Sequence, residues 1–530
     1  MAQPLNRRNF LEHGVLAGCA ATLTALSTPA HADLARPTAN TRHGRVRGYR
    51  QDDICVFKGV RYGADTGPRR FQAPLPPVSW GGVRDAIDYG PASPQRRGDA
   101  NQSEDCLFLN VWTPGLRDNR RRAVMVYLHG GAYNSGSGSS PLYDGARLAR
   151  RGDVVVVTLN HRLNALGYGY LARLGGEAFA DSGNVGQLDL ILALEWVRDN
   201  ITEFGGDPGR VMVFGQSGGG AKIATLMAMP AARGLFHSAA TMSGQQVTAS
   251  GPLNATRRAE ALLQALGLTR AAVEKMRTIP VPSLINAMAT TDPVLGDGSL
   301  YFGPVLDERN LPRHPFYPDA ASQGLSIPMI LGNTRDETRG FVGSDRSVYT
   351  LTWEEVAARL PGQLRIDVDP DHVVQAYRRQ FPHMSPSDVY FAAGTAGRSW
   401  RAQVIEAEER ARAGAPAYVY QLNFSSPVDG GILGAHHTLD IPLVFNTLDV
   451  EGSRTGSGPD AVAASNAISE AFIALAKSGN PNCSALATWS PYTLPTRETM
   501  IIDAQCHMEN NPRRWEREFF ARIPYIQPGS

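Results

Sequence analysis

Six short segments of this chain are apolar along their whole length, and they constrain its fold more than any other feature of the sequence. A strand buried on one face alternates apolar and polar residues, whereas a strand buried on both faces is apolar throughout. Between two of the segments, residues 188–204 carry apolar side chains at helical spacing. Strands that alternate with helices predict an α/β fold with a mostly parallel central sheet flanked by helices. The six segments are 123–128, 154–159, 211–214, 328–331, 417–422 and 500–503.

The rest of the chain indicates one domain. Residues 44–62 have the pattern of antiparallel strands. No tandem repeat, low-complexity run or interdomain linker follows residue 32, so we expect a single domain over residues 33–530. With 530 residues, 42% of them hydrophobic, the chain can bury a large core without the support of disulfides or metals.

Acidic and basic residues nearly balance. The chain has 52 Lys and Arg against 50 Asp and Glu, a net charge of +2. This balance argues against a protein built to bind nucleic acid. The apolar stretch over residues 15–26 is too short, and too broken by Gly and Thr, to form a stable membrane span. The sequence leaves the oligomeric state open.

The N-terminus has the pattern of an export signal. Residues 6–11, Asn-Arg-Arg-Asn-Phe-Leu, form a twin-arginine motif, and Ala30-His31-Ala32 is a cleavage site of the A-x-A type. We therefore expect a twin-arginine signal peptide over residues 1–32 and a periplasmic or secreted protein. Residues 16–19 resemble a lipoprotein box, but they lie too early in the chain, which argues against lipid anchoring at Cys19.

The four cysteines that follow the signal peptide are Cys55, Cys106, Cys483 and Cys506. Four cysteines in a chain of this length do not make a disulfide scaffold, although an oxidising compartment permits disulfides. None of them lies in a C-x-x-C pair, which argues against a cysteine zinc site. The disulfide connectivity among them stays open.

A serine follows one of the expected strands. Residues 215–219, Gly-Gln-Ser-Gly-Gly, join the strand over 211–214 to a helix expected over 218–229. This strand–turn–helix context is the one that a nucleophile elbow requires, and it presents Ser217 at a helix N-terminus. A phosphate-binding loop is the less favoured interpretation, because residues 220–223 break the Gly-Lys-Ser/Thr pattern. A purely structural turn stays open as an alternative.

A second glycine-rich loop fits the same chemistry. Residues 129–133, His-Gly-Gly-Ala-Tyr, directly follow the strand over 123–128 and match an oxyanion loop. Small residues let backbone N–H groups approach a reacting carbonyl closely. A nucleophilic serine also needs a base and an acid that orients the base.

With these motifs in place, the chain resembles the type-B carboxylesterase family of α/β-hydrolases, which includes the cholinesterases. The resemblance covers residues 44–523. It implies an α/β-hydrolase fold with N-terminal antiparallel strands and helical insertions around an active-site gorge. It also implies a serine hydrolase that cleaves carboxylic esters and needs no cofactor. The matching segments are 57–62, 103–111, 160–163, 204–211 with 215–219, and 479–482.

The resemblance implies a catalytic triad of Ser217, Glu337 and His437, in the chain order of α/β-hydrolases. Glu337 lies in a Gly-x-x-x-Asp-Glu element in which Thr338 replaces the usual glycine; its neighbour Asp336 is the rival for the acid. His437 fits the register of the histidine loop, and its neighbour His436 does not. A metal site at this His-His pair is not expected, because further ligands at a suitable spacing are missing.

The resemblance also implies the residues around the triad. The oxyanion donors would be the N–H groups of Gly131, Ala132 and Gly218. Ser243 and Asp440 match positions around the acid, with ordinary satisfied polar residues as the alternative. Gln216 replaces an acidic residue that often precedes the serine, which removes a negative charge beside the histidine.

The expected partner is a small-molecule ester, cleaved through an acyl-enzyme intermediate. Amides, thioesters and carbamates are alternative substrates for the same triad. A non-catalytic binding protein of the same fold is a further alternative, although such relatives typically lose triad residues and here all three positions are filled. The physiological ester and its acyl and alcohol groups stay open.

Two departures from the family bear on disulfides and substrate. Ser93 stands where many relatives have the cysteine that pairs with Cys106, so Cys106 is expected to lack that disulfide. Residues 94–102 contain no aromatic ring, whereas cholinesterase-like members have a key Trp in this loop, and they include Arg96 and Arg97. A cation site of that kind is missing, and we expect a preference for neutral or anionic esters.

Overall fold

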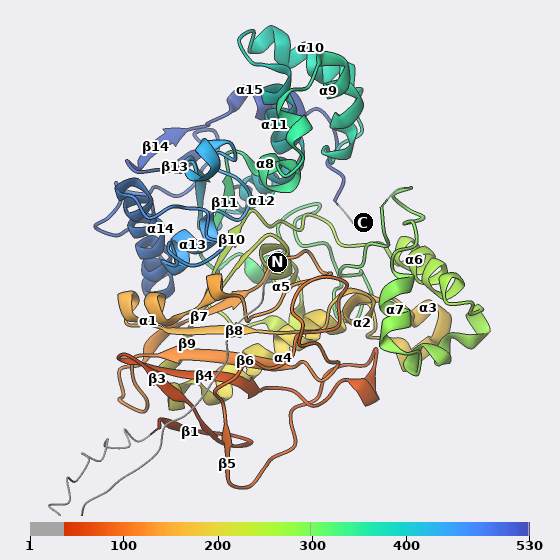
Figure 1. Ribbon diagram of the computed structural model, residues 1–530, viewed down its shortest axis with the longest axis vertical. Coiled ribbons are helices and arrows are strands. Elements are labelled where there is room, and N and C mark those ends of the chain that lie inside the picture. The colour runs from red at the N-terminus through yellow and green to blue at the C-terminus, as the bar shows by residue number, and fades with distance from the viewer. Residues whose placement is uncertain (1–35, 297, 528, 530) are drawn as a thin grey trace, which may run out of the picture. The chain divides into compact units, whose positions relative to one another are not determined.

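A run of parallel strands forms the middle of an eleven-stranded sheet, ordered β14-β13-β12-β11-β10-β9-β7-β8-β6-β4-β3 (Figure 1). The computed structural model describes residues 36–296, 298–527 and 529. All six predicted apolar segments lie largely or wholly within strands of this parallel run, which also includes β10. The parallel strands are β7 (Arg122–Leu128), β8 (Val155–Leu159), β9 (Gly206–Gln216), β10 (Ser238–Met242), β11 (Met329–Thr334), β12 (Ala417–Leu422) and β13 (Glu498–Ile502).

The two edges of the sheet are antiparallel. At one edge, β6, β4 and β3 pair antiparallel in turn, and at the other edge β14 pairs antiparallel with β13. A separate small sheet has the order β1-β2-β5, in which β1 and β2 are antiparallel. The prediction of antiparallel strands over 44–62 is therefore confirmed, although β2 also pairs parallel with β5. These strands are β1 (Thr38–Thr41), β2 (Gly44–Arg47), β3 (Tyr49–Gln51), β4 (Ile54–Arg61), β5 (Val83–Asp85), β6 (Phe108–Thr113) and β14 (His507–Asn510).

Side chains of the parallel strands enter two cores, one on each face of the sheet. In β7, Val124 belongs to the core that contains α4 (Val185–Asn200), and Met125 belongs to the core that contains α14 (Pro459–Ser478). Successive side chains of a strand point to opposite faces, so every position of such a strand is buried. This burial explains why the segments are apolar throughout rather than alternating.

The two helices expected near the serine motif form with shifted ends. The helix expected over 188–204 is α4, which begins earlier and is followed by a 3-10 turn over Ile201–Phe204. The helix expected over 218–229 is α5 (Gly218–Leu226), which ends before Met229. Met229 is extended, as expected for a residue that precedes a proline.

Long insertions between strands form two helical lobes (Figure 1). The insertion between β10 and β11 contains α6 and α7, with a core that includes Leu262 and Met276. The insertion between β11 and β12 contains α8 to α12, and α8 to α11 share a core with α15. The helices not bounded above are α1 (Ala146–Gly152), α2 (Asn164–Tyr168), α3 (Ala172–Gly175), α6 (Pro252–Ala265), α7 (Val281–Ala287), α8 (Glu337–Val342), α9 (Trp353–Arg359), α10 (Pro370–Gln380), α11 (Pro386–Thr395), α12 (Arg401–Arg412), α13 (Asp440–Phe445) and α15 (Arg514–Phe520).

Several sequence-based expectations concern the termini and the cysteines. Pro37–Ser530 form one compact unit. The signal peptide expected over 1–32 and the box at Cys19 lie outside the described residues. No helix among those described is long and apolar enough to cross a membrane. Cys106 is buried and free, so it lacks the disulfide that Ser93 precludes. The other three cysteines of the described residues are also free, Cys55 buried and Cys483 and Cys506 partly buried.

One buried carboxyl group in this fold is incompletely paired. Glu406, on α12, has no solvent exposure. Its Oε1 accepts a hydrogen bond of 2.7 Å from the Gln246 N–H, while its Oε2 has no partner within the described residues. Burial raises the pKa of Glu406 to about 8, against the opposing effects of that hydrogen bond and of Arg410. The folded chain therefore holds a proton that the unfolded chain releases at neutral pH.

The Glu406→Gln variant tests this proton. A carboxyl group whose folded pKa is raised stabilises the fold below about pH 4.5, and this contribution is lost as the pH rises through about 8. We expect the free energy of unfolding of the wild type to fall relative to that of the variant between pH 5 and pH 8, by about 1 kcal/mol or more. Urea unfolding at several pH values measures the difference. If the free energies of unfolding of the wild type and the variant differ by a constant amount over this pH range, the raised pKa of Glu406 is contradicted.

Candidate active site

Three adjacent parallel strands end at the same edge of the sheet and carry the predicted site residues. Ser217 follows β9, Ser243 follows β10, and Glu337 lies just beyond β11. The N–H of Ser217 donates to the carbonyl oxygen of Met242 (2.8 Å), and the N–H of Ser243 donates to that of Gly332 (2.7 Å). In open α/β sheets, the carboxyl edge of the strands is where ligands bind.

The chain turns sharply at Ser217. Its φ and ψ are +55° and −124°, outside the regions that a serine normally adopts, and α5 begins at the next residue. A Cβ at Gly218 would lie 2.1 Å from the carbonyl oxygen of Ala132, and one at Gly219 would lie 1.9 Å from that of Leu128. Only glycines allow so close an approach. The expected strand–turn–helix geometry is therefore present.

The loop after β7 reaches the same place. Gly131 and Ala132 both have positive φ angles, +82° and +51°. Together with Gly218, Ser217 and His437, they line a cavity of about 440 Å³. The structure thus brings all three expected oxyanion donors to the cavity that holds the serine and the histidine.

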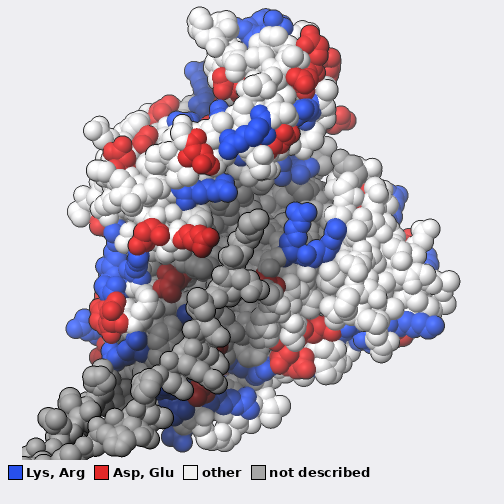
Figure 2. All heavy atoms as spheres, viewed as in Figure 1, with Lys and Arg blue, Asp and Glu red and all other residues white. Residues whose placement is uncertain are grey.

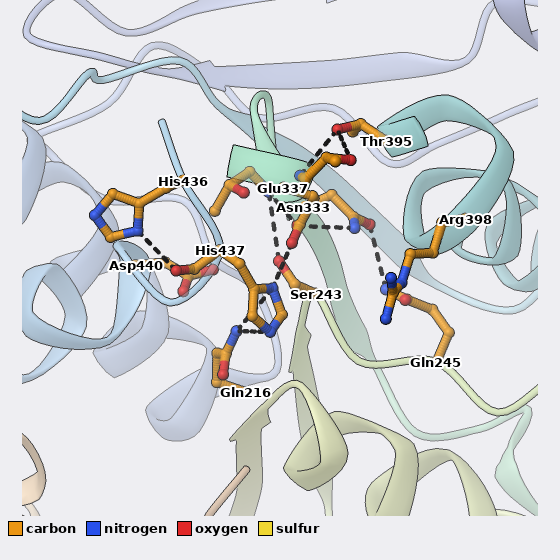
Figure 3. A network of polar contacts seen from close by, with 12 residues as sticks. Gln216, Ser243, Gln245, Asn333, Glu337, Thr395, Arg398, His436, His437 and Asp440 are labelled. Atoms are coloured by element: carbon orange, nitrogen blue, oxygen red, sulfur yellow. Dashed lines mark hydrogen bonds and ion pairs between the residues drawn. The ribbon is translucent and has the colours of Figure 1, made fainter. Parts of the chain in front are cut away.

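The imidazole of His437 binds the carboxylate of Glu337 (Figure 3). Its Nδ1 donates to Oε2 of Glu337, whose other oxygen accepts from the Thr334 N–H (2.9 Å) and from Nδ2 of Asn333 (3.1 Å). Glu337 is fully buried. Burial opposes its charge, but His437 together with hydrogen bonds from His437, Ser243 and Thr334 outweighs burial and keeps the pKa of Glu337 below its usual value. The carboxylate is therefore ionised at neutral pH.

The second nitrogen of this imidazole is available as an acceptor. Because Nδ1 carries a hydrogen and donates it in the hydrogen bond to Glu337, Nε2 carries no hydrogen in this neutral tautomer. In this structure Nε2 of Gln216 lies 3.2 Å from Nε2 of His437 and donates to it. Ser217 shares the cavity with His437, and the hydrogen bonds of the imidazole go to Glu337 and Gln216.

The rival residues lie elsewhere. Oδ2 of Asp336 accepts from the Ala435 N–H (2.9 Å) and pairs with Arg335 (3.0 Å). His436 donates from Nδ1 to the carbonyl oxygen of His437 (2.7 Å), and burial lowers the pKa of His436. Both residues hold the backbone of the histidine loop rather than contacting the imidazole of His437. Within the described ranges, no cluster of three or more His, Cys, Asp or Glu side chains is arranged to hold a metal ion.

Ser243 and Asp440 lie near Glu337 in different ways. Ser243 lines the cavity, and its Oγ accepts weakly from the Thr334 N–H (3.4 Å). Asp440 is buried at the start of α13, where Oδ2 accepts from the Tyr420 hydroxyl (2.8 Å). Burial, and then the charge of Glu337, raise the pKa of Asp440 to about 7.

Thr338, which departs from the family pattern, is accommodated by α11. Its N–H donates to Oγ1 of Thr395 (3.2 Å), and the two hydroxyl oxygens lie 3.0 Å apart. Sequence reasoning gave no role to Thr395, which lies in no recognisable motif, or to Asn333, which occupies an unspecified position of the Gly-x-x-x-Asp-Glu element. A threonine is thus compatible with the local backbone at position 338.

Sequence reasoning considered Lys222 only as part of a phosphate loop and missed its structural place. Lys222 is fully buried on α5, and its Nζ donates to the carbonyl oxygen of His129 (2.9 Å). Burial lowers the pKa of Lys222 to about 7. His129 is the first residue of the loop that carries Gly131 and Ala132, so this amino group ties that loop to the helix after Ser217. A lone lysine within an apolar helix was the available signal.

The fold and the site define an α/β-hydrolase: a mostly parallel sheet flanked by helices, with a serine turn after one strand and an acid after another at the same edge. The model of the carboxylesterase family matches residues 35–520. The chain belongs to this family and is an enzyme that hydrolyses carboxylic esters.

Named relatives agree with this membership. The chain is 36% identical to para-nitrobenzyl esterase of Bacillus subtilis over 495 residues, covering 90% of this chain and 97% of that protein. It is 34% identical to phenmedipham hydrolase of Pseudarthrobacter oxydans, covering 88% and 95%. Among solved structures, carboxylesterase EST55 of Geobacillus stearothermophilus aligns with a TM-score of 0.82 at 35% identity, covering 92% and 100%.

The Lys222→Met variant tests the contact beneath the glycine loop. Methionine fills a similar volume but cannot donate to His129, so the loop over 130–132 loses its tie to α5. We expect the kcat for 4-nitrophenyl acetate to fall about tenfold, with a smaller change in KM, from the typical strength of a buried hydrogen bond. Lys275→Met, at an exposed lysine, is the matched control. A wild-type kcat in a folded Lys222→Met variant would show that the loop is held by other contacts.

Proposed function

We propose that this carboxylesterase cleaves esters with Ser217 as the nucleophile, His437 as the general base and Glu337 as the acid that orients the base. One observation carries the assignment. The carboxylate of Glu337 accepts from Nδ1 of His437, and the imidazole lines the same cavity as Ser217. This order of acid, base and nucleophile is the arrangement that activates a serine hydroxyl.

In the first half of the reaction, Oγ of Ser217 attacks the ester carbonyl carbon while its proton passes to Nε2 of His437. Glu337 stabilises the imidazolium that forms. The tetrahedral intermediate collapses, the bond to the alcohol oxygen breaks, and His437 returns the proton to the leaving alkoxide. The acyl group is then bound to Ser217 as an ester.

In the second half, water takes the place of the alcohol. His437 removes a proton from the water, which attacks the acyl carbonyl, and a second tetrahedral intermediate forms. Its collapse breaks the bond to Oγ of Ser217, which regains the proton from His437. The carboxylic acid leaves, and the enzyme is restored.

Negative charge develops on the former carbonyl oxygen in both halves. We assign its stabilisation to the N–H groups of Gly131, Ala132 and Gly218, three residues that line the cavity. Gly218 is the first residue of α5, where the partial positive charge of a helix N-terminus adds to these donors. Donors held in place before the reaction lower the barrier more than mobile water does.

The surrounding polar residues support the triad without taking part in bond changes. Gln216 is neutral and donates to Nε2 of His437, so the Ser217 hydroxyl must displace this contact when the base acts. Ser243 lowers the pKa of Glu337 through a hydrogen bond. Buried Asp440 adds a second carboxyl group, which lies close enough to Glu337 for the charge of Glu337 to raise the pKa of Asp440.

Esters are favoured over the alternative substrates of the same triad. Amides have a poorer leaving group than esters, and thioesters and carbamates would react through the same residues. A binding role without catalysis is disfavoured because serine, histidine and acid are all in place. Release of nitrophenolate in a burst on mixing with a nitrophenyl ester distinguishes catalysis from binding.

The Ser217→Ala variant tests the nucleophile. Loss of one hydroxyl at a half-buried turn should leave the packing, and so the stability, unchanged. The effect on activity should be large, because the triad acts as a unit and removal of one member disables it. We expect kcat for a nitrophenyl ester to fall by a factor on the order of 10⁶, with an unchanged thermal unfolding temperature. Turnover close to that of the wild type, with contaminating esterase excluded, would refute the assignment.

The pair of neighbouring histidines offers a matched comparison. His437→Asn removes the base, and we expect a loss as large as that of the serine variant, on the order of 10⁶ in kcat. His436→Asn keeps a donor for the carbonyl oxygen of residue 437, so it should retain activity within about tenfold of the wild type. The reverse order of the two variants would show that the histidine loop is assigned in the wrong register.

A further inference from the structure

Two arginines, Arg365 and Arg398, line the cavity that holds Ser217 and His437. No Asp or Glu is found among the described residues that line it. On the face seen in Figure 2, a group of Lys and Arg side chains lies to the right of the centre of the molecule, and Asp and Glu side chains lie to its left. The wall of the cavity therefore carries positive charge, which attracts anions.

The backbone holds the two arginines side by side. The N–H of Arg365 donates to the carbonyl oxygen of Gly397 (3.0 Å), and its own carbonyl oxygen accepts from the Ile526 N–H (2.7 Å). Arg398 lies at a kink within Ala396–Trp400, between α11 and α12, where its φ and ψ of −116° and −107° are not helical. The guanidinium groups thus come from separate segments that are joined by main-chain hydrogen bonds.

Arg398 lies one aromatic ring away from the proposed base. Its Cζ is 4.1 Å from the ring centroid of Phe341, and that ring lies 4.4 Å from the imidazole of His437. One nitrogen of Arg398 donates to Oε1 of Gln363 (3.2 Å). Figure 3 shows Arg398 on the opposite side of His437 from His436.

Neither guanidinium group has a carboxylate partner among the residues that the structure describes. Nε of Arg365 is buried without a partner in the described structure, and neither group forms an ion pair there. Two buried arginines elsewhere are paired, Arg162 with Asp189 and Arg258 with Asp292, at 2.6 and 2.7 Å. Buried Arg410 has no carboxylate partner, but its guanidinium donates to the carbonyl oxygens of Gly324, Ile327 and Pro416. Among the described residues, nothing of either kind is found for the guanidinium of Arg365, and a bound ligand would supply such a partner.

The electrostatics favour an anion between them. Burial, and then the charge of Arg365, lower the pKa of Arg398 to about 10, so the group is still positive at neutral pH. Like charges held together out of water repel each other, and a bound anion relieves this repulsion. The planar fork of a guanidinium group matches the two oxygens of a carboxylate.

We propose that Arg365 and Arg398 form a subsite for a carboxylate of the substrate, and that the preferred esters carry a free carboxylate a few bonds from the scissile carbonyl. Monoesters of short dicarboxylic acids have this form. The single ring between Arg398 and His437 sets the short spacing. The inference rests on the proposed roles of Ser217 and His437, and it narrows the expected preference for neutral or anionic esters to anionic ones.

Two matched pairs of substrates test the subsite. On the acyl side, 4-nitrophenyl hydrogen glutarate is compared with the nitrophenyl ester in which a primary amide replaces the free carboxylate. This control has nearly the same shape but no charge. On the alcohol side, 4-carboxyphenyl acetate is compared with 4-carbamoylphenyl acetate. We expect kcat/KM at pH 7.5 to favour the acid at least tenfold in one of the pairs. Spontaneous hydrolysis, which a neighbouring carboxylate accelerates, is subtracted.

Variants of Arg365 and Arg398 show whether these two residues cause the preference for the substrate with a free carboxylate. Arg398→Gln and Arg365→Gln should each lower the ratio of acid to amide by about tenfold or more, and Arg398→Lys should retain part of it. Arg412→Gln, on α12 but exposed and paired with Glu408, should leave the ratio at the wild-type value. Because each ratio is measured within one variant, it reports specificity even where a variant is less active, and the two positions check each other.

The outcomes separate the subsite from the catalytic assignment. The inference is overturned if neither acid is preferred, or if the preference survives both Arg365→Gln and Arg398→Gln. It is also overturned if the double change Arg96→Gln and Arg97→Gln abolishes the preference instead, since these exposed arginines line a separate cavity beside Asn134. In all of these cases, the proposed function is tested separately with the uncharged control esters, which carry a primary amide in place of the carboxylate. If Ser217→Ala no longer cleaves their ester bond, the proposed function is supported. If the ester bond is still cleaved, the proposed function is contradicted.

Discussion

The parallel pairing of β9, β10 and β11 is the constraint on which the site depends. Because these strands run in the same direction in adjacent positions, the residues that follow them must meet at one edge of the sheet. Ser217, Ser243 and Glu337 come from distant parts of the chain and are brought together in this way. The cores on both faces of the sheet hold the strands in register, so packing far from the cavity positions the chemistry.

Close approach of backbones is the second requirement at this edge. Gly218 lies against Ala132, and Ser217 adopts a positive φ that costs conformational energy. The surrounding contacts compensate, including the main-chain hydrogen bond from Ser217 to the end of β10 and the tie from Lys222 to His129. The same geometry leaves no room for side chains where an oxyanion would form.

The charges around the cavity differ in how they are satisfied. Glu337 is buried but ionised, because it accepts hydrogen bonds from His437, Asn333 and the Thr334 N–H. Arg365 and Arg398 have no such carboxylate partner among the described residues, and burial with mutual repulsion lowers the pKa of Arg398. The cavity therefore has a fully hydrogen-bonded carboxylate, the proposed acid, beside two arginines without carboxylate partners among the described residues, and this arrangement fits the proposed selection of anionic esters.

The sequence by itself determined the fold class, the serine turn and the family, because each depends on local order. Apolar runs show which strands are buried on both faces, and Gly215, Ser217 and Gly218 follow one of those strands directly. Tertiary structure alone decided the contacts between distant residues. The family motif already implied Glu337 over Asp336, and the structure adds the hydrogen bond of Glu337 to His437. The burial of Lys222 against the glycine loop and the position of Arg365 beside Arg398 came from tertiary structure alone. No local pattern encodes these contacts, because each depends on how separate segments pack at one edge of the sheet.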